Sequence, residues 1–363
     1  MKNKKIAFYI GSLHKGGAER VITNLAEYFY KKGYQVWMVT KFKADVEYPL
    51  SEGITRVLAD ITKEEEKGRV QNLFLRIAKL RKIFKEIHPD IVVSFIGKSN
   101  LMSIAATRGT GIPVAVSVRG NPSDEIGGGW KKKLTFFMFG MAEGVILQST
   151  GAKAFFPKNI QKKAIVLKNP LNPEFIRPEY NGAKRHEIVA VGRIDENKNQ
   201  RMLVEAFAPL AEQYQDWTVV LYGDGDDRKY VEQRVQELGL ENRVFFKGIQ
   251  EKIAEKIEGS SVYVLTSRQE GMPNALMEAM VLGLAAISTD CPCGGPKDLI
   301  TPQENGILIP VDDTIALTRE MERLMKEPTL REKLSRNAML LKESVMPDRV
   351  NMEWEEYLTQ IAQ

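Results

Sequence analysis

The amino-acid sequence predicts an α/β protein made of two doubly wound domains, each built around a parallel β-sheet. The chain has 363 residues, which exceeds the length at which one hydrophobic core usually stops growing. Short β-branched runs alternate with amphipathic helical stretches, as in parallel sheets. This alternation is interrupted by one Pro- and Asn-rich segment, residues 168–173, where the balance of charge also reverses. Two domains joined near residue 170 are therefore expected.

The first half of the chain begins with a basic segment and a short apolar run. The run meets Gly11 and a polar stretch at once, so it fits a buried strand better than a secretory signal. One helix is expected to end near Lys32, and another to cover residues 70–87. The expected strands are 6–10, 36–40, 91–95 and 114–118.

In the second half the same alternation restarts. Helices are expected to end near Tyr214 and Leu238, and residues 314–363 read as helical with a break at Pro347. The expected strands are 187–191, 218–222, 244–246, 262–265 and 285–288. Ligands of open α/β folds bind at the carboxyl ends of the strands, so tandem domains predict a cleft there. The expected parts are one domain over 1–170, a second domain over 171–345, and a C-terminal helix over 346–363 that packs back on the first domain.

Composition narrows the class of protein. No stretch approaches the roughly 20 apolar residues of a membrane span. Cys291 and Cys293 cannot form a disulfide framework and lack further metal ligands nearby, which favours a reducing cytoplasm. Up to Lys168 there are 29 Lys+Arg against 14 Asp+Glu, a net charge of +15, and the remainder carries −10. A basic half suits an anionic membrane, a phosphorylated acceptor or nucleic acid, although no helix-turn-helix pattern supports nucleic acid.

A glycine pair follows the first predicted strand. Gly16 and Gly17 would let the backbone approach a ligand closely, and the helix that begins there offers free N–H groups to a phosphate. A plain strand-to-helix turn is the alternative. The pattern is not Gly-x-Gly-x-x-Gly, and the second strand ends in Thr40-Lys41 rather than in an acid, so a dehydrogenase is disfavoured.

Two cations follow the opening strand of the second domain. Arg193 and Lys198 stand on a loop at the carboxyl end of that strand, where a planar fork and a point charge could clamp a diphosphate. Solvated loop cations are the alternative.

The densest group of polar residues spans 267–280. Glu270 lies on the loop after a strand, and a helix begins after Pro273, with Glu278 about one turn into it. Two acids on either side of a helix N-terminus suit a ligand with hydroxyls at both ends and an anionic middle. Because burying Glu278 without a partner is costly, a hydroxyl-rich ligand would satisfy it.

Five ordered motifs, close to full length, together resemble the family 4 retaining glycosyltransferases. They are Gly-Gly-x-Glu-Arg after the first strand, Gly-Arg-x4-Lys-Asn from Gly192, Gly-x-Gly at Gly223 and Gly225, Glu-x7-Glu at Glu270 and Glu278, and Gly-Pro-x-x-Leu-Ile over 295–300. The resemblance implies the GT-B architecture, in which two Rossmann-like domains face each other across a cleft.

The resemblance also implies roles for individual residues. The loop at Gly16 and Gly17 would approach the donor phosphates and the acceptor, while Arg193 and Lys198 bind the diphosphate. Glu270 would contact the transferred sugar, so the implied catalytic residues are Glu270, Arg193 and Lys198. The implied donor-binding set is Gly16, Gly17, Arg193, Lys198, Gly223, Gly225, Gly271, Met272, Pro273, Asn274, Ala275, Leu276 and Glu278.

The implied activity is transfer of a hexose or N-acetylhexosamine from a nucleotide diphosphate sugar, with UDP-sugar expected as the donor. Configuration would be retained by front-face attack, without a metal or other cofactor, because cations and a helix N-terminus stabilise the leaving group. The implied acceptor is a lipid-linked glycan or polysaccharide at the inner face of the cell membrane. Alternatives are a non-catalytic sugar-nucleotide or polyanion binder and a sugar-nucleotide epimerase of the same architecture.

Four residues depart from this pattern or qualify it. Many relatives carry a histidine where this chain has Arg119, which could contact an anionic donor or acceptor group or lie at the surface. His14 could contact the sugar or acceptor, or be incidental. Asp224 and Asp226 look like a paired-aspartate metal motif, but they follow a strand within the Gly-x-Gly turn, which predicts solvated or capping acids and no metal.

One segment of the basic half predicts reversible docking on an anionic membrane. Three lysines, 131–133, lie beside large apolar side chains, and helical spacing places Trp130, Leu134, Phe137 and Met141 on one face. The alternative is that the apolar side chains are core and the lysines cover them. In either case the protein is expected to be cytoplasmic and peripheral to the membrane.

Overall fold

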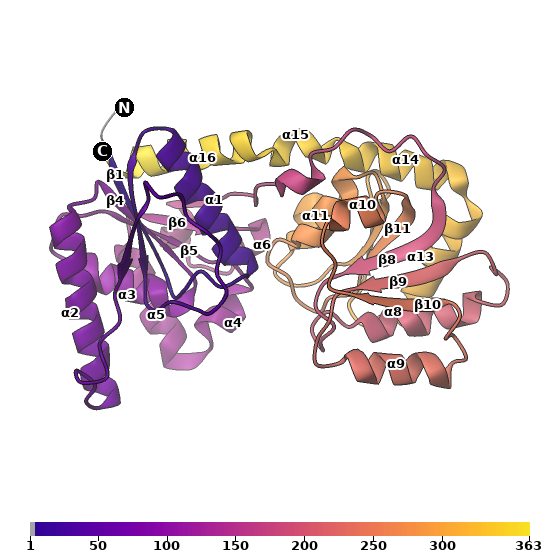
Figure 1. Ribbon diagram of the computed structural model, residues 1–363, viewed down its shortest axis with the longest axis horizontal. Helices are drawn as coiled ribbons and strands as arrows, with labels where there is room; N and C mark the ends of the chain where they lie inside the picture. The colour runs from indigo at the N-terminus through magenta and orange to yellow at the C-terminus, as the bar shows by residue number, and fades with distance from the viewer. Residues whose placement is uncertain (1–3) are drawn as a thin grey trace. The chain divides into compact units, whose positions relative to one another are not determined.

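The computed structural model describes residues 4–363 and divides into two compact units. Unit 1 runs to Asn169 and also contains Val350–Gln363, whereas unit 2 is the continuous segment Pro170–Arg349 (Figure 1). The second crossing thus follows Arg349 and not residue 345. Val345 is fully buried in unit 2, where its carbonyl accepts a hydrogen bond from the Leu171 N–H at 2.8 Å.

Unit 1 contains a parallel seven-stranded sheet with the order β3-β2-β1-β4-β5-β6-β7. The order reverses between β1 and β4, which is the topological switch point of a doubly wound sheet. The strands are β1 (Lys5–Ile10), β2 (Gln35–Thr40), β3 (Thr55–Leu58), β4 (Ile91–Phe95), β5 (Val114–Ser117), β6 (Gly144–Leu147) and β7 (Ala164–Val166).

Helices cover both faces of the unit 1 sheet. On one face α1 and α16 bury their apolar stripes against alternate residues of β1 and β4, and Trp354 of α16 is fully buried. On the other face Tyr9 packs edge-on against Phe84 of α2. The helices are α1 (Gly17–Lys31), α2 (Arg69–Ile87), α3 (Gly97–Thr107), α4 (Pro122–Ile126), α5 (Gly129–Met141), α6 (Thr150–Ala154), α7 (Lys158–Gln161) and α16 (Pro347–Ile361).

Unit 2 contains a parallel six-stranded sheet with the order β10-β9-β8-β11-β12-β13. One core lies under α8, α9 and α13, and a second core lies under α10, α11 and α12. The strands are β8 (Arg185–Val191), β9 (Thr218–Tyr222), β10 (Val244–Gly248), β11 (Ser260–Leu265), β12 (Ala285–Thr289) and β13 (Ile307–Ile309). The helical elements are η1 (Pro173–Phe175), α8 (Gln200–Phe207), η2 (Ala208–Leu210), α9 (Arg228–Glu237), α10 (Ile253–Ile257), α11 (Asn274–Val281), α12 (Gly295–Leu299), α13 (Thr314–Lys326), α14 (Pro328–Met339) and α15 (Leu341–Val345).

The α/β prediction is confirmed, and every strand predicted from the sequence is present with bounds shifted by at most two residues. The sequence analysis missed β3, β6, β7 and β13, which have three or four residues each. Such short runs offer too few residues for a periodic signal. Across residues 4–363, none of the helices combines the length and apolarity needed to cross a membrane.

Candidate functional site

The candidate donor site of unit 2 is built on three loops that follow neighbouring strands. The strand β8 lies between β9 and β11, so the loops after these strands meet at the carboxyl edge of the sheet. The three loops are 192–199, 223–227 and 266–273. They carry most of the donor-binding residues that the sequence analysis selected, and they occupy the edge at which open α/β sheets bind ligands.

Glycines allow two of these loops to touch. Gly223 has φ of +132°, and a Cβ added there would lie 1.8 Å from the Gly192 carbonyl oxygen. A Cβ on Gly225 would lie 2.4 Å from the oxygen of Ile194. Only glycine fits at these approaches, so the Gly-x-Gly turn packs directly on the backbone that presents Arg193.

Lys198 and Glu270 form an ion pair that joins the first and third loops. Lys198 Nζ lies 2.5 Å from Glu270 Oε1, and the Ser267 hydroxyl donates to the same carboxylate oxygen at 2.6 Å. The two charged side chains are 20% and 11% exposed. The Thr266 hydroxyl further donates to the Lys198 carbonyl at 2.7 Å. The predicted catalytic lysine and glutamate are thus held together, mostly screened from water.

Arg193 differs from Lys198 in being largely free to move. Its side chain is 78% exposed, and its Nη2 lies 3.2 Å from Asp195 Oδ2. The other oxygen of Asp195 accepts the Lys198 backbone N–H at 2.9 Å. Asp195 therefore links both cations. A ligand anion could recruit Arg193 at little cost, because exposed ion pairs are weak.

The helix α11 begins directly after the loop that carries Glu270. Pro273 precedes it, and its first turn includes Asn274, Ala275 and Leu276, so this is a helix N-terminus of the kind at which anions bind. Glu278 lies one turn further and is only 8% exposed, in agreement with the expectation that it is buried. Gly271 is contacted from α12, where a Cβ on Gly295 would lie 1.6 Å from the Gly271 oxygen.

A tyrosine under the site connects the two glutamates electrostatically. Burial raises the pKa of the Tyr263 hydroxyl, and the nearby Glu270 and Glu278 carboxylates raise it further. Burial, followed by the charge of Glu270, also raises the pKa of the Cys291 thiol to about 12. Both groups therefore stay neutral at physiological pH beneath the charged side chains.

In unit 1 the glycine pair lies where β1 gives way to α1. Gly16 is the N-cap of α1 and Gly17 its first residue. His14 lies on the preceding loop with a side chain that is 59% exposed.

Arg119 follows β5 and lies between two aromatic rings. Its guanidinium carbon is 5.1 Å from the centre of the Phe95 ring and 5.8 Å from that of the Trp354 ring, and it donates to the Asn169 side chain. The side chain is half-buried, and burial lowers the pKa of its guanidinium to about 9. Arg119 is therefore not the solvated surface arginine that the sequence left open.

Sequence reasoning missed four residues that support the site. Tyr263 lies among the apolar residues of β11, and nothing in its spacing marks it, whereas Ser267 begins the polar group 267–280 but was given no role there. Asp195 and Glu19 were visible inside the Gly-Arg and Gly-Gly motifs. Their place inside these motifs could have identified them, because a charged residue close to ligand-binding positions can orient its neighbours.

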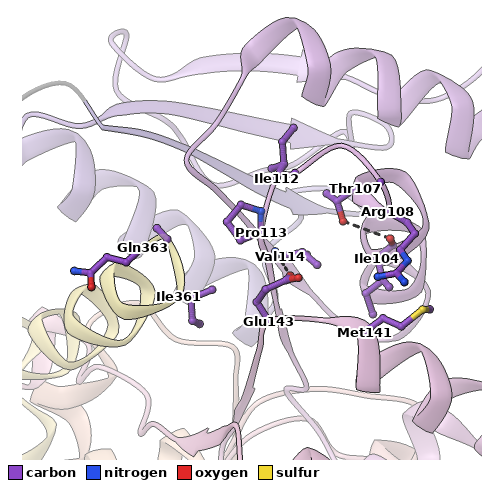
Figure 2. A pocket seen from close by; sticks show the side chains of 13 residues that line it. Ile104, Thr107, Arg108, Ile112, Pro113, Val114, Met141, Glu143, Ile361 and Gln363 are labelled. Atoms are coloured by element: carbon purple, nitrogen blue, oxygen red, sulfur yellow. Dashed lines mark hydrogen bonds between the residues drawn. The ribbon is translucent and has the colours of Figure 1, made fainter.

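Two pockets are lined by none of the predicted donor-binding residues. One, of about 440 Å³, is in unit 2 beside the first loop and is lined by residues that include Asp195, Arg268 and Asp312. The other, of about 400 Å³, lies in unit 1 at the amino ends of β5 and β6 (Figure 2). Its carboxylate, Glu143, already accepts the Val114 N–H at 2.8 Å. Neither pocket contains a predicted catalytic residue.

The acids of the Gly-x-Gly turn are solvent-exposed. Asp224 accepts the Gly225 N–H at 2.8 Å and pairs with Arg228 at 3.3 Å, while Asp226 is exposed. Neither side chain caps α9. Within the described residues there is no group of three or more His, Cys, Asp or Glu side chains that could hold a metal ion.

Comparison with known proteins gives two family matches. Residues 172–340 match the family described as Glycosyl transferases group 1, and residues 15–175 match the family described as Glycosyltransferase Family 4. The two matches meet near the boundary between unit 1 and unit 2.

Full-length relatives and solved structures agree with these matches. A Campylobacter jejuni α-1,4-N-acetyl-D-galactosaminyltransferase, named for an undecaprenol diphosphate-linked substrate, is 27% identical over 98% of this chain and 99% of that protein. The amylovoran biosynthesis glycosyltransferase AmsD of Erwinia amylovora is 22% identical over 96% and 97%. Anabaena HepE, solved with UDP and glucose, superposes with a TM-score of 0.82 at 19% identity, covering 98% of this chain and 100% of that one. The last likeness supports the GT-B fold.

Proposed function

Since the chain belongs to family 4 of the glycosyltransferases, we propose that it transfers a hexose or N-acetylhexosamine from a UDP-sugar to a lipid-linked or polysaccharide acceptor, with retention of anomeric configuration. That it is a glycosyltransferase is established by the family matches and the named relatives. The donor, the stereochemistry and the acceptor are the proposal.

The observation that carries the proposal is the Lys198–Glu270 pair at the carboxyl edge of unit 2. A cation of the first loop and an acid of the loop that precedes the N-terminus of α11 are held 2.5 Å apart, with Arg193 exposed on the first loop. A nucleotide diphosphate sugar offers a matching series of groups: a sugar hydroxyl for Glu270, phosphate oxygens for the cations, and a ribose hydroxyl for Glu278.

The proposed catalysis depends on where negative charge develops during the transfer. As the bond between the sugar C1 and the β-phosphate oxygen breaks, negative charge builds on the UDP that leaves. We propose that Lys198 and the N-terminus of α11 are held in place before the diphosphate binds and that the exposed Arg193 joins them, so that they stabilise the transition state more than the ground state. Gly16 and Gly17 are proposed to contact the donor phosphates. This role of the cations leaves no need for a divalent metal.

The names of relatives support a polyprenyl diphosphate-linked glycan as the acceptor. One full-length relative is named for transfer to an undecaprenol diphosphate-linked glycan, and another for synthesis of the polysaccharide amylovoran. An acceptor of this kind lies at a membrane surface. We therefore propose that the protein works at the cytoplasmic face of the membrane.

Unit 1 has an exposed apolar face that suits such a surface. In α5 the side chains of Trp130, Leu134 and Phe137 are 70%, 45% and 67% exposed, next to the lysines 131–133. Phe139 of the same helix is buried, so part of the aromatic cluster is core, but the predicted face largely is not. Lysines beside exposed aromatic rings attract anionic lipid headgroups and let the rings enter the interface.

Unit 1 has a second exposed apolar patch. Val70, Leu73 and Phe74 in the first turns of α2 are 67%, 47% and 67% exposed. The helices α2 and α5 both pack against α3. Both helices begin at the carboxyl edge of the sheet, so their exposed first turns lie on the same side of unit 1 as the Gly16 turn.

The test of the proposal is a donor screen with turnover measured by nucleotide release. The purified protein is incubated with UDP-, GDP- and ADP-sugars, with and without a polyprenyl diphosphate-linked glycan, and the anomeric configuration of the product is read by NMR. Release of UDP that depends on the acceptor, with a retained configuration, is the expected result. Binding of UDP-sugars without any release would instead identify a catalytically silent binder, and interconversion of the donor sugar would identify an epimerase.

A further inference from the structure

The pocket of about 440 Å³ in unit 2 has no role in the proposed reaction. Its walls come from the loop 192–199, from the amino-terminal parts of α8, α9 and α13, and from Arg268 of the third loop. The volume falls within the roughly 300–1,000 Å³ of small-molecule sites. All of these segments belong to unit 2, so the pocket is formed within one compact unit.

Two arginines of the pocket are held by carboxylates and still have a free donor. Asp312 accepts hydrogen bonds from Arg268 Nε and Asn199 Nδ2, each at 2.9 Å. On α8, Arg201 Nε donates to Glu205 at 2.8 Å. The Nη2 of each arginine makes no hydrogen bond among residues 4–363. The lining therefore presents two oriented N–H donors to a ligand.

Two hydrogen-bond acceptors of the lining also lack a protein partner. Gln200 is only 5% exposed, and within the part of the chain that the structure describes its Oε1 is buried without a hydrogen bond. Its Nε2 donates to the Arg193 carbonyl at 2.5 Å. The carboxylate of Asp227 precedes α9 but does not cap it. A buried acceptor without a partner costs free energy, which a ligand with a hydrogen-bond donor would recover.

The charges of the lining favour a neutral ligand with many hydroxyls. Five carboxylates and two guanidiniums give a formal charge of −3, which disfavours an anion. The helices α8, α9 and α13 all begin at the pocket, and each N-terminus contributes about +0.5, which opposes a cation. Hydroxyls both donate and accept hydrogen bonds, so they match the free donors and acceptors. The half-exposed ring of Tyr230 adds a flat apolar surface.

We propose that this pocket is a second ligand site, which takes a sugar ring of a glycan and is separate from the donor site of the same unit. Hydroxyl groups of the sugar donate to Gln200 Oε1 and to the Asp227 carboxylate. Other hydroxyl oxygens accept from the Nη2 groups of Arg201 and Arg268. The C–H groups on one face of the sugar pack against the Tyr230 ring.

The pocket is coupled to the donor loop by two side chains of its lining. Gln200 holds the Arg193 carbonyl, and Asp195 accepts the Lys198 N–H at 2.9 Å and pairs with Arg193 at 3.2 Å. A sugar that orders these side chains also orders the loop that presents both cations, which removes part of the cost of binding a diphosphate. Bound sugar is therefore expected to tighten UDP binding, and UDP to tighten sugar binding by the same factor. This coupling rests on the proposed function, whereas the pocket does not.

The first experiment measures sugar binding to the full chain without nucleotide. Methyl α-glycosides of glucose, galactose and N-acetylgalactosamine are titrated by saturation-transfer NMR, and again with saturating UDP to exclude binding in the donor site. Asp227→Ala is expected to weaken binding by about 10-fold or more, because it removes a charge-assisted hydrogen bond but no helix cap. Tyr230→Ala should also weaken binding, and Tyr230→Phe should retain it. The matched control is Lys229→Ala, an exposed position of the same helix outside the pocket.

The second experiment measures UDP binding by calorimetry, with and without a saturating glycoside. The glycoside is expected to lower the Kd for UDP about fivefold in the wild type, and to have no effect in Asp227→Ala, whose Kd for UDP alone stays unchanged. Equal glycoside binding in the wild type, Asp227→Ala and Tyr230→Ala would overturn the proposal. Binding of putrescine or inorganic phosphate in place of the glycosides would overturn it as well. Glycoside binding that depends on Asp227, in a protein that neither binds nor releases UDP, would support the pocket and contradict the proposed function.

Discussion

Lys198 and Glu270 neutralise each other: Nζ lies 2.5 Å from Oε1, with Ser267 as the carboxylate's second partner. The lysine that we assign to the diphosphate is thus already partnered by the acid that we assign to the sugar. A donor must share or break this contact, and the two residues should respond to substitution with opposite effects on nucleotide binding.

Lys198→Met is expected to weaken UDP binding by about 10- to 150-fold, because a charge-assisted hydrogen bond contributes on the order of 1.5–3 kcal/mol. Glu270→Gln is expected to bind UDP at least as tightly as the wild type, because it removes the competing carboxylate, and yet to lose most of its kcat. Calorimetry with UDP and initial transfer rates measure both effects. Equal UDP affinity in Lys198→Met and wild type would rule out this role for the lysine.

Glu278→Gln is expected to weaken donor binding, whereas Arg193→Ala is expected to lower kcat. Glu278 is buried one turn into α11. Losing its charge-assisted bond to a ribose hydroxyl is expected to weaken the binding free energy of the donor by about 1.5–3 kcal/mol, which raises the donor Kd, with little further loss in kcat. Arg193 is 78% exposed, and its loss should act mainly on kcat, because the diphosphate gains charge as the bond breaks. Steady-state kinetics with the true donor distinguishes the two. Wild-type parameters in both variants would refute the assignment.

Transfer should proceed without a divalent metal. The exposed Asp224 and Asp226 are expected to tolerate simultaneous substitution to Asn, with kcat/KM within about threefold of wild type, because solvated surface acids contribute little. The assay is run with and without a chelator. Activity that is lost on chelation and regained with manganese or magnesium would require a different account of leaving-group stabilisation.

Unit 1 should bind anionic vesicles in a salt-dependent way. Each lysine near an anionic surface contributes about 1 kcal/mol, and the attraction weakens as salt shortens the Debye length. Co-sedimentation with phosphatidylglycerol vesicles should be strong for the wild type at low salt and lost in the Lys131/Lys132/Lys133→Glu variant.

The matched control is Lys229/Lys252/Lys333→Glu, which makes the same charge change at exposed positions of unit 2. A Phe74→Ser/Phe137→Ser variant tests the apolar contribution and should lower binding at high salt as well. Wild-type protein that stays in solution at low salt, or a control that loses binding equally, would favour a soluble acceptor.

The Glu47 carboxylate should make the stability of the fold decrease as the pH falls through the acid range. The hydrogen bond from Arg56 lowers the pKa of its carboxyl to about 2, so the stabilisation is complete above the unfolded-state pKa of about 4.3 and is lost as pH falls towards 2. Glu47→Gln is therefore expected to lower the thermal denaturation midpoint at pH 7 and to converge with the wild type near pH 2. The exposed Glu52→Gln serves as control. A difference in denaturation midpoint between Glu47→Gln and the wild type that stays constant from pH 7 to pH 2 would contradict this explanation.

The sequence predicted the architecture because its longer strands are β-branched runs with clear ends, such as β4 and β9. It could not predict α6 or α7, whose five and four residues give no helical period. These short helices form because neighbouring strands and loops hold their ends, which is tertiary information. Ser149, for example, accepts the Ala152 N–H and so starts α6.

The candidate site could be predicted where a motif carries it, and not where partners are far apart in sequence. Lys198 and Glu270 were both selected from their motifs, but their pairing was not, since 72 residues separate them. The surroundings of Arg119 were equally hidden: Trp354 comes from the far end of the chain. Spacing identifies residues with a function, whereas the contacts that tune them depend on the fold.

Unit 1 is built from two separate segments of the chain, so it cannot finish folding until the second segment has been synthesised. Unit 2 is one continuous segment and can fold as soon as it leaves the ribosome, but the core of unit 1 contains Val350, Trp354 and Leu358. The part of the protein that is synthesised first is therefore completed last, and until then the face of Phe95 that Trp354 covers stays exposed. A nascent chain would carry a folded unit 2 beside an incomplete unit 1, so any activity that needs both units can begin only after the segment with Trp354 has been synthesised.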